Sequence, residues 1–179
     1  MPGSTRSSSG TDRHLWATIL AGGVGSRFWP ASTPARPKQL LPLGSDAPLI
    51  ADTVDRARAL TDDARIRVLA RADLVDAMRS VLPPLPSPTW MTEPAPRGTG
   101  PALAWAAARL HREDPDAVLV SLHADHVIRP VDRFVDLVRS AADLARREGV
   151  LVTLGVEPDR PETGYGYIQP GGSLGGDAW

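Results

Sequence analysis

The sequence contains no cysteine, a single lysine and only 5% aromatic residues. Without cysteine the chain can form neither disulfides nor thiolate metal sites. No apolar run reaches the roughly 20 residues that a membrane-spanning helix needs. A formal net charge of −1 provides no broad positive field for binding nucleic acid. We therefore expect a cytoplasmic protein that binds neither membranes nor nucleic acid.

The 179 residues have the composition of one globular domain, with 42% hydrophobic and 23% charged residues. Residues 1–14 are small and polar and lack the apolar core of a signal peptide, which predicts a disordered leader. Residues 171–179 are rich in glycine and predict a frayed tail. The domain is therefore expected to span residues 15–170.

Strand-like and helix-like segments alternate through this domain. The predicted strands are 15–20, 66–70, 117–122, 150–155 and 165–169, and the predicted helices are 49–60, 73–82, 99–111 and 131–147. Such alternation predicts an α/β fold with a Rossmann-like, mainly parallel sheet flanked by helices. In sheets of this kind, ligands bind beyond the carboxyl ends of the strands.

A glycine-rich loop follows the first predicted strand and contains Gly22, Gly23 and Gly25, with Arg27 close behind. Glycines let backbone N–H groups gather around an anion, and an arginine adds a fixed positive charge. The spacing fits neither a Walker A loop nor a dinucleotide fingerprint, which would require a glycine at Phe28. On the glycines alone, an ordinary glycine turn is an equally good interpretation.

Lys38, the only lysine, lies in the segment Pro-Lys-Gln-Leu-Leu-Pro-Leu. Together with the glycine loop and Arg27, this segment resembles the signature of the sugar-nucleotide pyrophosphorylases. In that signature, Gly-Gly-x-Gly-x-Arg is followed by a hydrophobic residue and x-Pro, and later by Pro-Lys-x-Leu-x-Pro-Leu. The resemblance implies that Arg27 and Lys38 act as catalytic cations on the phosphates, while Gly22, Gly23 and Gly25 contact the nucleotide.

Residues 93–102 resemble the Glu-Pro-x-x-Arg-Asn-Thr-Ala-Pro-Ala segment of the mannose-1-phosphate guanylyltransferases. Guanine presents two adjacent N–H donors, and one carboxylate can accept both. Glu93 is therefore the candidate for recognising the base, although a surface glutamate before a turn is the alternative. Thr99 is expected to bind nucleotide and to cap the following helix. Gly98 and Gly100 depart from the family pattern.

Asp125 follows a predicted strand in a segment that resembles the Pro-Ala-Asp-His-x-Ile motif of the same family. The resemblance implies that this carboxylate binds Mg²⁺, a role suited to oxygen ligands beside phosphates. His123 replaces the usual proline. His123 and His126 leave a zinc site as a weaker alternative, and His126 is expected to make a structural hydrogen bond.

Residues 161–168 resemble the family's Pro-x-Thr-Gly-Tyr-Gly-Tyr-Ile segment, which lines the sugar side of the cleft. The resemblance implies that Gly164, Tyr165 and Gly166 bind the sugar. An ordinary turn into an edge strand is the alternative.

The four segments, found in order, imply an enzyme that transfers GMP from GTP to mannose 1-phosphate by Mg²⁺-assisted in-line attack, releasing pyrophosphate. The family continues well beyond the last segment and has a later Glu-Lys-Pro motif, which a chain without a second lysine cannot contain. We therefore expect a C-terminally truncated chain with an incomplete sheet and little or no activity alone. A non-catalytic nucleotide-binding or regulatory subunit, an inactive fragment and an unrelated α/β module are the alternatives. The sequence leaves homo-oligomerisation open.

Overall fold

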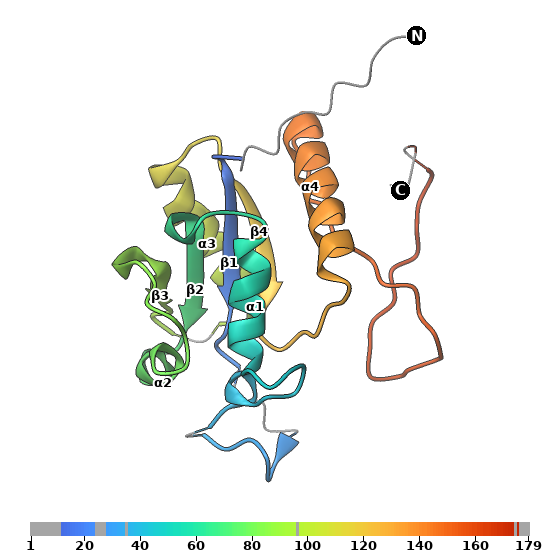
Figure 1. Cartoon of the computed structure of the whole chain (residues 1–179). Coiled ribbons are helices and arrows are strands. Elements are labelled where there is room, and N and C mark those ends of the chain that lie inside the picture. The colour runs from blue at the N-terminus through green and yellow to red at the C-terminus, as the bar shows by residue number, and fades with distance from the viewer. Residues whose placement is uncertain (1–11, 24–27, 35, 96, 174, 176–179) are drawn as a thin grey trace.

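A parallel sheet forms the centre of the computed structural model, which describes residues 12–23, 28–34, 36–95, 97–173 and 175 (Figure 1). Four strands run in the order β3-β2-β1-β4, and every neighbouring pair is parallel. Their bounds are Leu15–Leu20 for β1, Ile66–Ala70 for β2, Trp90–Thr92 for β3 and Val118–His123 for β4. The predicted Rossmann-like sheet is confirmed, and β3 is a strand that the sequence did not predict.

β1 lies inside the sheet because its sequence, LWATIL, provides apolar side chains for both faces. Ala17 lies opposite Ile66 of β2 and Val120 of β4, and Ile19 is fully buried. Strands of parallel sheets are covered on both faces and therefore have nearly continuous hydrophobic sequences. Burying a side chain such as Ile19 contributes about 1.5–3 kcal/mol.

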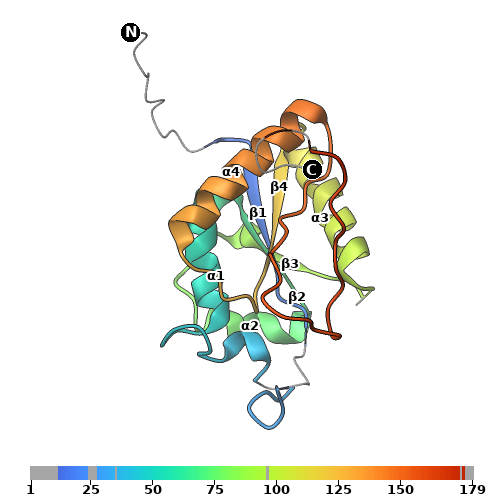
Figure 2. The same ribbon diagram turned by 90° about the vertical axis from the view of Figure 1, so that its right-hand side faces the viewer.

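Helices cover both faces of the sheet. Their bounds are Leu49–Arg58 for α1, Val75–Arg79 for α2, Thr99–Glu113 for α3 and Val131–Glu148 for α4. The larger apolar cluster joins one face of the sheet to α1, α2 and α4 through Val54, Met78 and Val138. A smaller cluster joins the other face to α3 through Ala102 and Ala106. Figure 2 shows α1 and α4 on one side of the sheet and α3 on the other.

The strand order reverses direction at β1. The chain moves from β1 to β2 and β3 on one side, and α3 then leads to β4 on the opposite side of β1. At such a switch point the loops after the two central strands separate and leave a crevice beyond their carboxyl ends. By this rule a ligand would bind beyond Leu20 and His123, at the carboxyl ends of β1 and β4.

Two glycines define helix ends. Gly149 ends α4 in the left-handed conformation, with φ of 65°, directly after the last helical residue. The expected cap at Thr99 is wrong, because Gly98 precedes α3 with φ of 89° and Thr99 is already the first helical residue. A backbone with this positive φ favours glycine over a residue with a side chain.

The predicted strands at 150–155 and 165–169 are not formed. Residues 150–173 run beside α4 without helix or strand, apart from the sheet (Figure 1). Among the described residues, no hydrogen bond or ion pair joins 151–173 to the sheet, and Leu151 and Val156 are almost fully exposed. An apolar run forms a strand only where a partner strand lies next to it. In the described residues, no strand lies beside either of these two segments. The domain boundary at 170 stays a prediction.

Residues at the amino end, assigned by sequence to the leader, contact the folded body. Asp12 accepts a hydrogen bond from Arg146 of α4 at 2.6 Å. The His14 Nδ1 atom lies 2.9 Å from the Asp114 carboxylate, which also accepts a hydrogen bond from the Trp16 indole at 2.9 Å. Residues 12 and 14 thus contact α4 and the turn before β4, while residues 1–11 of the predicted leader lie outside the described residues. Asp114 joins the start of β1 to the turn before β4.

Replacing Asp114 with asparagine is expected to destabilise the chain above about pH 5 and to matter less in acid. The Trp16 indole, with His14 and the backbone of Asp116, lowers the pKa of the Asp114 carboxyl below its ordinary value of 3.8. A lowered pKa contributes stability above the unfolded value, and this contribution is lost as the pH falls through the folded value. Urea unfolding at pH 7 and pH 3 measures the difference, with Asp116→Asn as the control. An equal loss at both pH values would contradict the prediction.

Candidate active site

The loops that follow three strands meet at the carboxyl edge of the sheet. Backbone hydrogen bonds extend the strand pairing past the last residues of the strands. They join the Ala21 amide to the Leu69 carbonyl at 2.8 Å and the Ala124 amide to the Leu20 carbonyl at 3.1 Å. The Glu93 amide likewise donates to the Ala70 carbonyl at 3.3 Å. The loops that contain Gly22, Glu93 and Asp125 therefore leave the same edge.

Lys38 and Asp125 come together at this edge, although 87 residues separate them in the sequence. The Lys38 ammonium donates to the Asp125 carboxylate at 3.4 Å and lies 4.3 Å from the centre of the Phe28 ring. The side chains are 20% and 46% exposed respectively. A solvent-accessible ammonium beside a carboxylate can bind an anion with the first group and a cation with the second.

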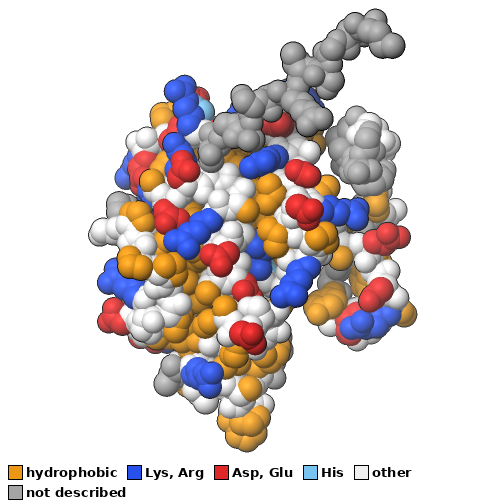
Figure 3. Space-filling view, in the orientation of Figure 1, with side chains coloured by type: hydrophobic (Ala, Val, Ile, Leu, Met, Phe, Trp, Pro, Cys, Tyr) orange, Lys and Arg blue, Asp and Glu red, His pale blue; other side chains and the backbone are white. Residues whose placement is uncertain are grey.

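The segment around Lys38 presents apolar side chains to solvent. Phe28, Trp29 and Leu43 are all more than two-fifths exposed. Figure 3 shows hydrophobic side chains at the lower end of the molecule, where this segment lies, as well as between the charged side chains on the rest of the visible face. The cation of the site is therefore bordered by apolar surface.

Gln39 connects the lysine segment to the glycine loop. Its side chain is 3% exposed, and its amide nitrogen donates to the Ala21 carbonyl at 2.8 Å and to the Gly23 carbonyl at 3.1 Å. These two bonds hold Gly22 between fixed points, next to the residue that carries the ammonium. This role was not predicted from the sequence. A glutamine between the only lysine and a leucine run was its only sequence signal.

Glu93 lies against the glycine loop. A Cβ atom at Gly22 would lie 3.1 Å from a carboxylate oxygen of Glu93, which is tighter than most such contacts. The predicted base-recognising carboxylate and the predicted phosphate loop are therefore neighbours. Glycine at position 22 allows the Glu93 carboxylate to come this close to the backbone.

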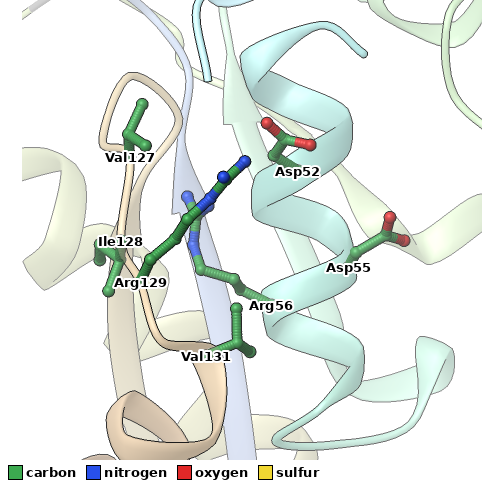
Figure 4. Close-up of a pocket in the computed structure, with 7 residues that line it drawn as sticks. All are labelled: Asp52, Asp55, Arg56, Val127, Ile128, Arg129 and Val131. Carbon is green, nitrogen blue, oxygen red and sulfur yellow. The ribbon is translucent and has the colours of Figure 1, made fainter. Parts of the chain in front are cut away.

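Two arginines join the loop after β4 to the elements on its other side. Arg56 of α1 is 5% exposed and donates to the His126 carbonyl at 2.8 Å. Arg129 donates to the Gly44 carbonyl at 2.6 Å. Figure 4 shows both guanidinium groups extending between this loop and α1, in a pocket also lined by Asp52. Their contacts hold the backbone around Asp125 in place.

His126 makes its structural hydrogen bond through its backbone carbonyl. Its ring stacks on the His123 ring with centroids 4.8 Å apart, and its Nε2 atom lies 3.9 Å from Asp125 Oδ1. Burial, followed by the neighbouring His123, lowers the pKa of His126 below its ordinary value of 6.5. The ring is therefore neutral at pH 7, and a neutral imidazole can bind a metal ion.

The other predicted site residues fall into three groups. Gly25 and Arg27 lie outside the described residues. Gly164, Tyr165 and Gly166 lie in the exposed segment apart from the sheet, and no described hydrogen bond brings them to Lys38 or Asp125. The structure thus brings together Gly22, Gly23, Lys38, Glu93 and Asp125. Thr99 begins α3 and is exposed, and the sugar-binding residues stay apart.

Asp125 is the described residue best suited to bind a divalent ion at this edge. Its carboxylate is 46% exposed, and only its Oδ2 atom is directed to Lys38. Mg²⁺ is commonly held by one or two carboxylates, with phosphate oxygens and water completing its shell. One accessible carboxylate beside a site for an anion fits this requirement.

Comparison with known proteins agrees with this arrangement. A family model described as nucleotidyl transferase matches residues 16–176. The mannose-1-phosphate guanylyltransferase of Escherichia coli K12 is 39% identical over 162 residues, which cover 88% of this chain and 33% of that protein. The enzyme of the same name from Klebsiella pneumoniae is 39% identical over 169 residues, covering 89% and 34%. The chain thus spans about a third of the length of these relatives.

Two solved structures share the fold. The crystal structure described as a mannose-1-phosphate geranyltransferase from Thermus thermophilus has a TM-score of 0.81 and 32% identity, covering 90% of this chain and 47% of that one. A Helicobacter pylori mannose-6-phosphate isomerase, at 22% identity and a TM-score of 0.61, shares the fold alone. In the described part of this chain, no helix combines the length and apolar character needed to cross a membrane. With the family model matching almost all of its length, the chain belongs to the nucleotidyl transferase family.

Proposed function

We propose that this chain is the nucleotide-binding part of a mannose-1-phosphate guanylyltransferase, which transfers GMP from GTP to mannose 1-phosphate. The observation that carries the proposal is the meeting of Lys38, Asp125 and the Gly22 loop at one edge of the sheet, with Glu93 beside the loop. In this proposal each role belongs to a different group. Lys38 is the cation, Asp125 binds the metal, the Gly22 loop binds phosphate, and Glu93 recognises the base. The named relatives support the choice of substrates.

In the proposed reaction, a phosphate oxygen of mannose 1-phosphate attacks the α-phosphorus of GTP. The bond from the α-phosphorus to the bridging oxygen of the β-phosphate breaks, and pyrophosphate leaves with the electron pair. The attacking phosphate is largely a dianion at neutral pH, since its second pKa is about 6, so no general base is needed. The chain contributes position and charge, which supply most of the catalysis in phosphoryl-type transfers.

Lys38 and Asp125 have distinct parts in this proposal. The Lys38 ammonium binds phosphate oxygens and neutralises the negative charge that grows on the leaving pyrophosphate. Arg27 and the backbone of Gly22, Gly23 and Gly25 complete the phosphate site. Asp125 would hold Mg²⁺, which neutralises phosphate charge when bound. Thr99 would add a nucleotide contact at the start of α3, and Gly164, Tyr165 and Gly166 would contact the sugar.

Replacing Glu93 with glutamine is expected to weaken GTP binding by about tenfold to a hundredfold, since hydrogen bonds to a charged acceptor contribute roughly 1.5–3 kcal/mol. A glutamine replaces one of the two charged oxygens with an NH₂ group, so one of the two guanine N–H groups would face a donor. Inosine triphosphate lacks the exocyclic amino group, so its binding should weaken less. Calorimetric titration of both nucleotides measures the ratio, with Glu157→Gln in the exposed segment as the control. An unchanged GTP to ITP ratio would remove Glu93 from base recognition.

A non-catalytic nucleotide-binding subunit is the second candidate. The observation in its favour is the position of residues 150–173, which lie apart from Lys38 and Asp125 (Figure 1). In that arrangement the nucleotide half of a site is assembled without the segment proposed to bind the sugar. Such a chain would bind GTP and release no pyrophosphate.

The test is pyrophosphate release by this chain with mannose 1-phosphate and Mg²⁺, comparing GTP, ATP, UTP, CTP and dTTP. Release that is selective for GTP supports guanylyl transfer. GTP binding without release, in a sample shown to be folded by circular dichroism, supports the binding subunit instead. Binding without preference among the five nucleotides would overturn the guanine assignment. A cytoplasmic location stays a prediction.

A further inference from the structure

The end of β4 brings two imidazoles and a carboxylate together. We propose that His123, Asp125 and His126 form a binding site for a divalent transition-metal ion of the Co²⁺ or Zn²⁺ type, which the site prefers to Mg²⁺. The proposal rests on the proposed function for the role of the ion. It adds two further ligands, His123 and His126, and the class of metal.

The distances are close to those of a shared ion. The potential ligand atoms of the three side chains all lie within 4.8 Å of one another, and His126 Nε2 lies 3.9 Å from Asp125 Oδ1. Ligands at about 2.0–2.2 Å from one ion stand roughly 3–4 Å apart. Closing the set therefore requires side-chain movements of about 1 Å, with no change of backbone.

The backbone that carries the three side chains is fixed on both sides. His123 is the last residue of β4 and lies opposite Leu20 of β1. The buried Ala124 is hydrogen-bonded to Leu20, and the His126 carbonyl accepts the hydrogen bond from Arg56. This loop therefore combines an anchored backbone with accessible side chains, which need only small rotations to meet at one ion.

The two carboxylate oxygens of Asp125 face different partners. Oδ2 accepts from the Lys38 ammonium at 3.4 Å, while Oδ1 lies on the side of the His126 ring. The carboxylate can therefore bind an ion through Oδ1 and keep its contact with Lys38 through Oδ2. The positive charges of Lys38 and the buried Arg56 lower the affinity for Co²⁺ and Mg²⁺ alike, so the ligands decide the preference between the two ions.

The donor set determines which ion is preferred. Mg²⁺ favours oxygen ligands and loses water reluctantly, whereas imidazole nitrogen suits Zn²⁺, Ni²⁺ and Co²⁺. Two imidazoles beside one carboxylate add much more to the affinity for Co²⁺ than to that for Mg²⁺. The same carboxylate without the histidines would favour Mg²⁺.

The experiment titrates the metal-free full chain with Co²⁺ and with Mg²⁺, in the absence of nucleotide, by calorimetry and by the visible absorption of Co²⁺. Co²⁺ is expected to bind at least about tenfold more tightly than Mg²⁺. His123→Gln and His126→Gln should each weaken Co²⁺ binding by about tenfold or more and leave Mg²⁺ binding nearly unchanged. Asp125→Asn should weaken the binding of both ions.

Matched histidines elsewhere provide the controls. His111→Gln changes an exposed histidine of α3 and should alter neither titration. His14 belongs to a second group with Asp114 and Asp116, but its Nδ1 atom is already 2.9 Å from the Asp114 carboxylate. His14→Gln should therefore leave Co²⁺ binding intact. If His123→Gln is poorly folded by circular dichroism, His123→Phe preserves a ring against His126 and removes the ligand.

The proposal is overturned if Co²⁺ and Mg²⁺ bind equally, if neither cluster histidine affects Co²⁺ binding, or if His14→Gln abolishes it. Because the titrations contain no nucleotide, a failure of guanylyl transfer leaves their result intact. Conversely, GTP-selective pyrophosphate release with no histidine-dependent Co²⁺ binding would refute this site and leave the proposed function in place.

Discussion

Replacing Lys38 with alanine is expected to lower pyrophosphate release from GTP by about 10²–10³-fold, the effect of removing one preorganised charge from a developing anion. Among the described lysine and arginine side chains, only Lys38 contacts Asp125. The sequence has no second lysine that could replace it. The Asp125→Ala variant should lose activity to a similar extent. The measurement is turnover at saturating GTP, together with GTP affinity by calorimetry, which gives a result even where turnover is low.

Lys38→Arg should fail almost as fully as Lys38→Ala. The ammonium is a compact charge on a flexible stem, whereas a guanidinium is a broad planar fork that does not replace an ammonium packed between phosphate groups. Arg36→Ala, an exposed cation two residues away, is the matched control and should keep both turnover and affinity. Near-normal turnover in Lys38→Ala would show that the ammonium has no part in the reaction.

The sequence predicted the sheet because its strands are buried on both faces. A segment such as 15–20 must be apolar throughout, and helices alternate with such segments at a spacing that permits only parallel pairing. β3 was not predicted, because its three residues, Trp90–Thr92, follow a proline-rich run and are too few to show an alternating pattern. The segment 150–155 was predicted as a strand for the same apolar character, but no strand lies beside it in the described chain.

The meeting of Lys38 and Asp125 could be expected, since both belong to segments that follow central strands and resemble one family's motifs. The contact between Glu93 and Gly22 could not, because it depends on how two loops leave the sheet. The role of Arg56 could not be predicted for another reason. Its partner is a backbone carbonyl, and a sequence does not indicate which carbonyl groups a buried guanidinium will face.

Gln39→Leu is expected to destabilise the chain by about 1–3 kcal/mol, the cost of leaving buried acceptors without donors. The Gln39 amide is the hydrogen-bond donor for the Ala21 carbonyl and contacts the Gly23 carbonyl as well. Leucine fills a similar volume but donates to neither. The glycine loop would also lose its link to the lysine segment, so GTP affinity should fall together with stability.

Gln39→Glu should be worse than Gln39→Leu at neutral pH, because an ionised carboxylate would face two carbonyl oxygens at hydrogen-bond distance in a site that is 3% exposed. Protonation of that carboxyl supplies a donor again, so the Glu variant should recover stability as the pH falls towards 5, while the Leu variant should not. Urea unfolding at both pH values separates the two. Gln169→Leu, in the exposed segment, is the control for the substitution itself. If all three variants unfolded alike, the two carbonyl contacts would not stabilise the loop, and the glycine loop would owe its position to the strand pairing alone.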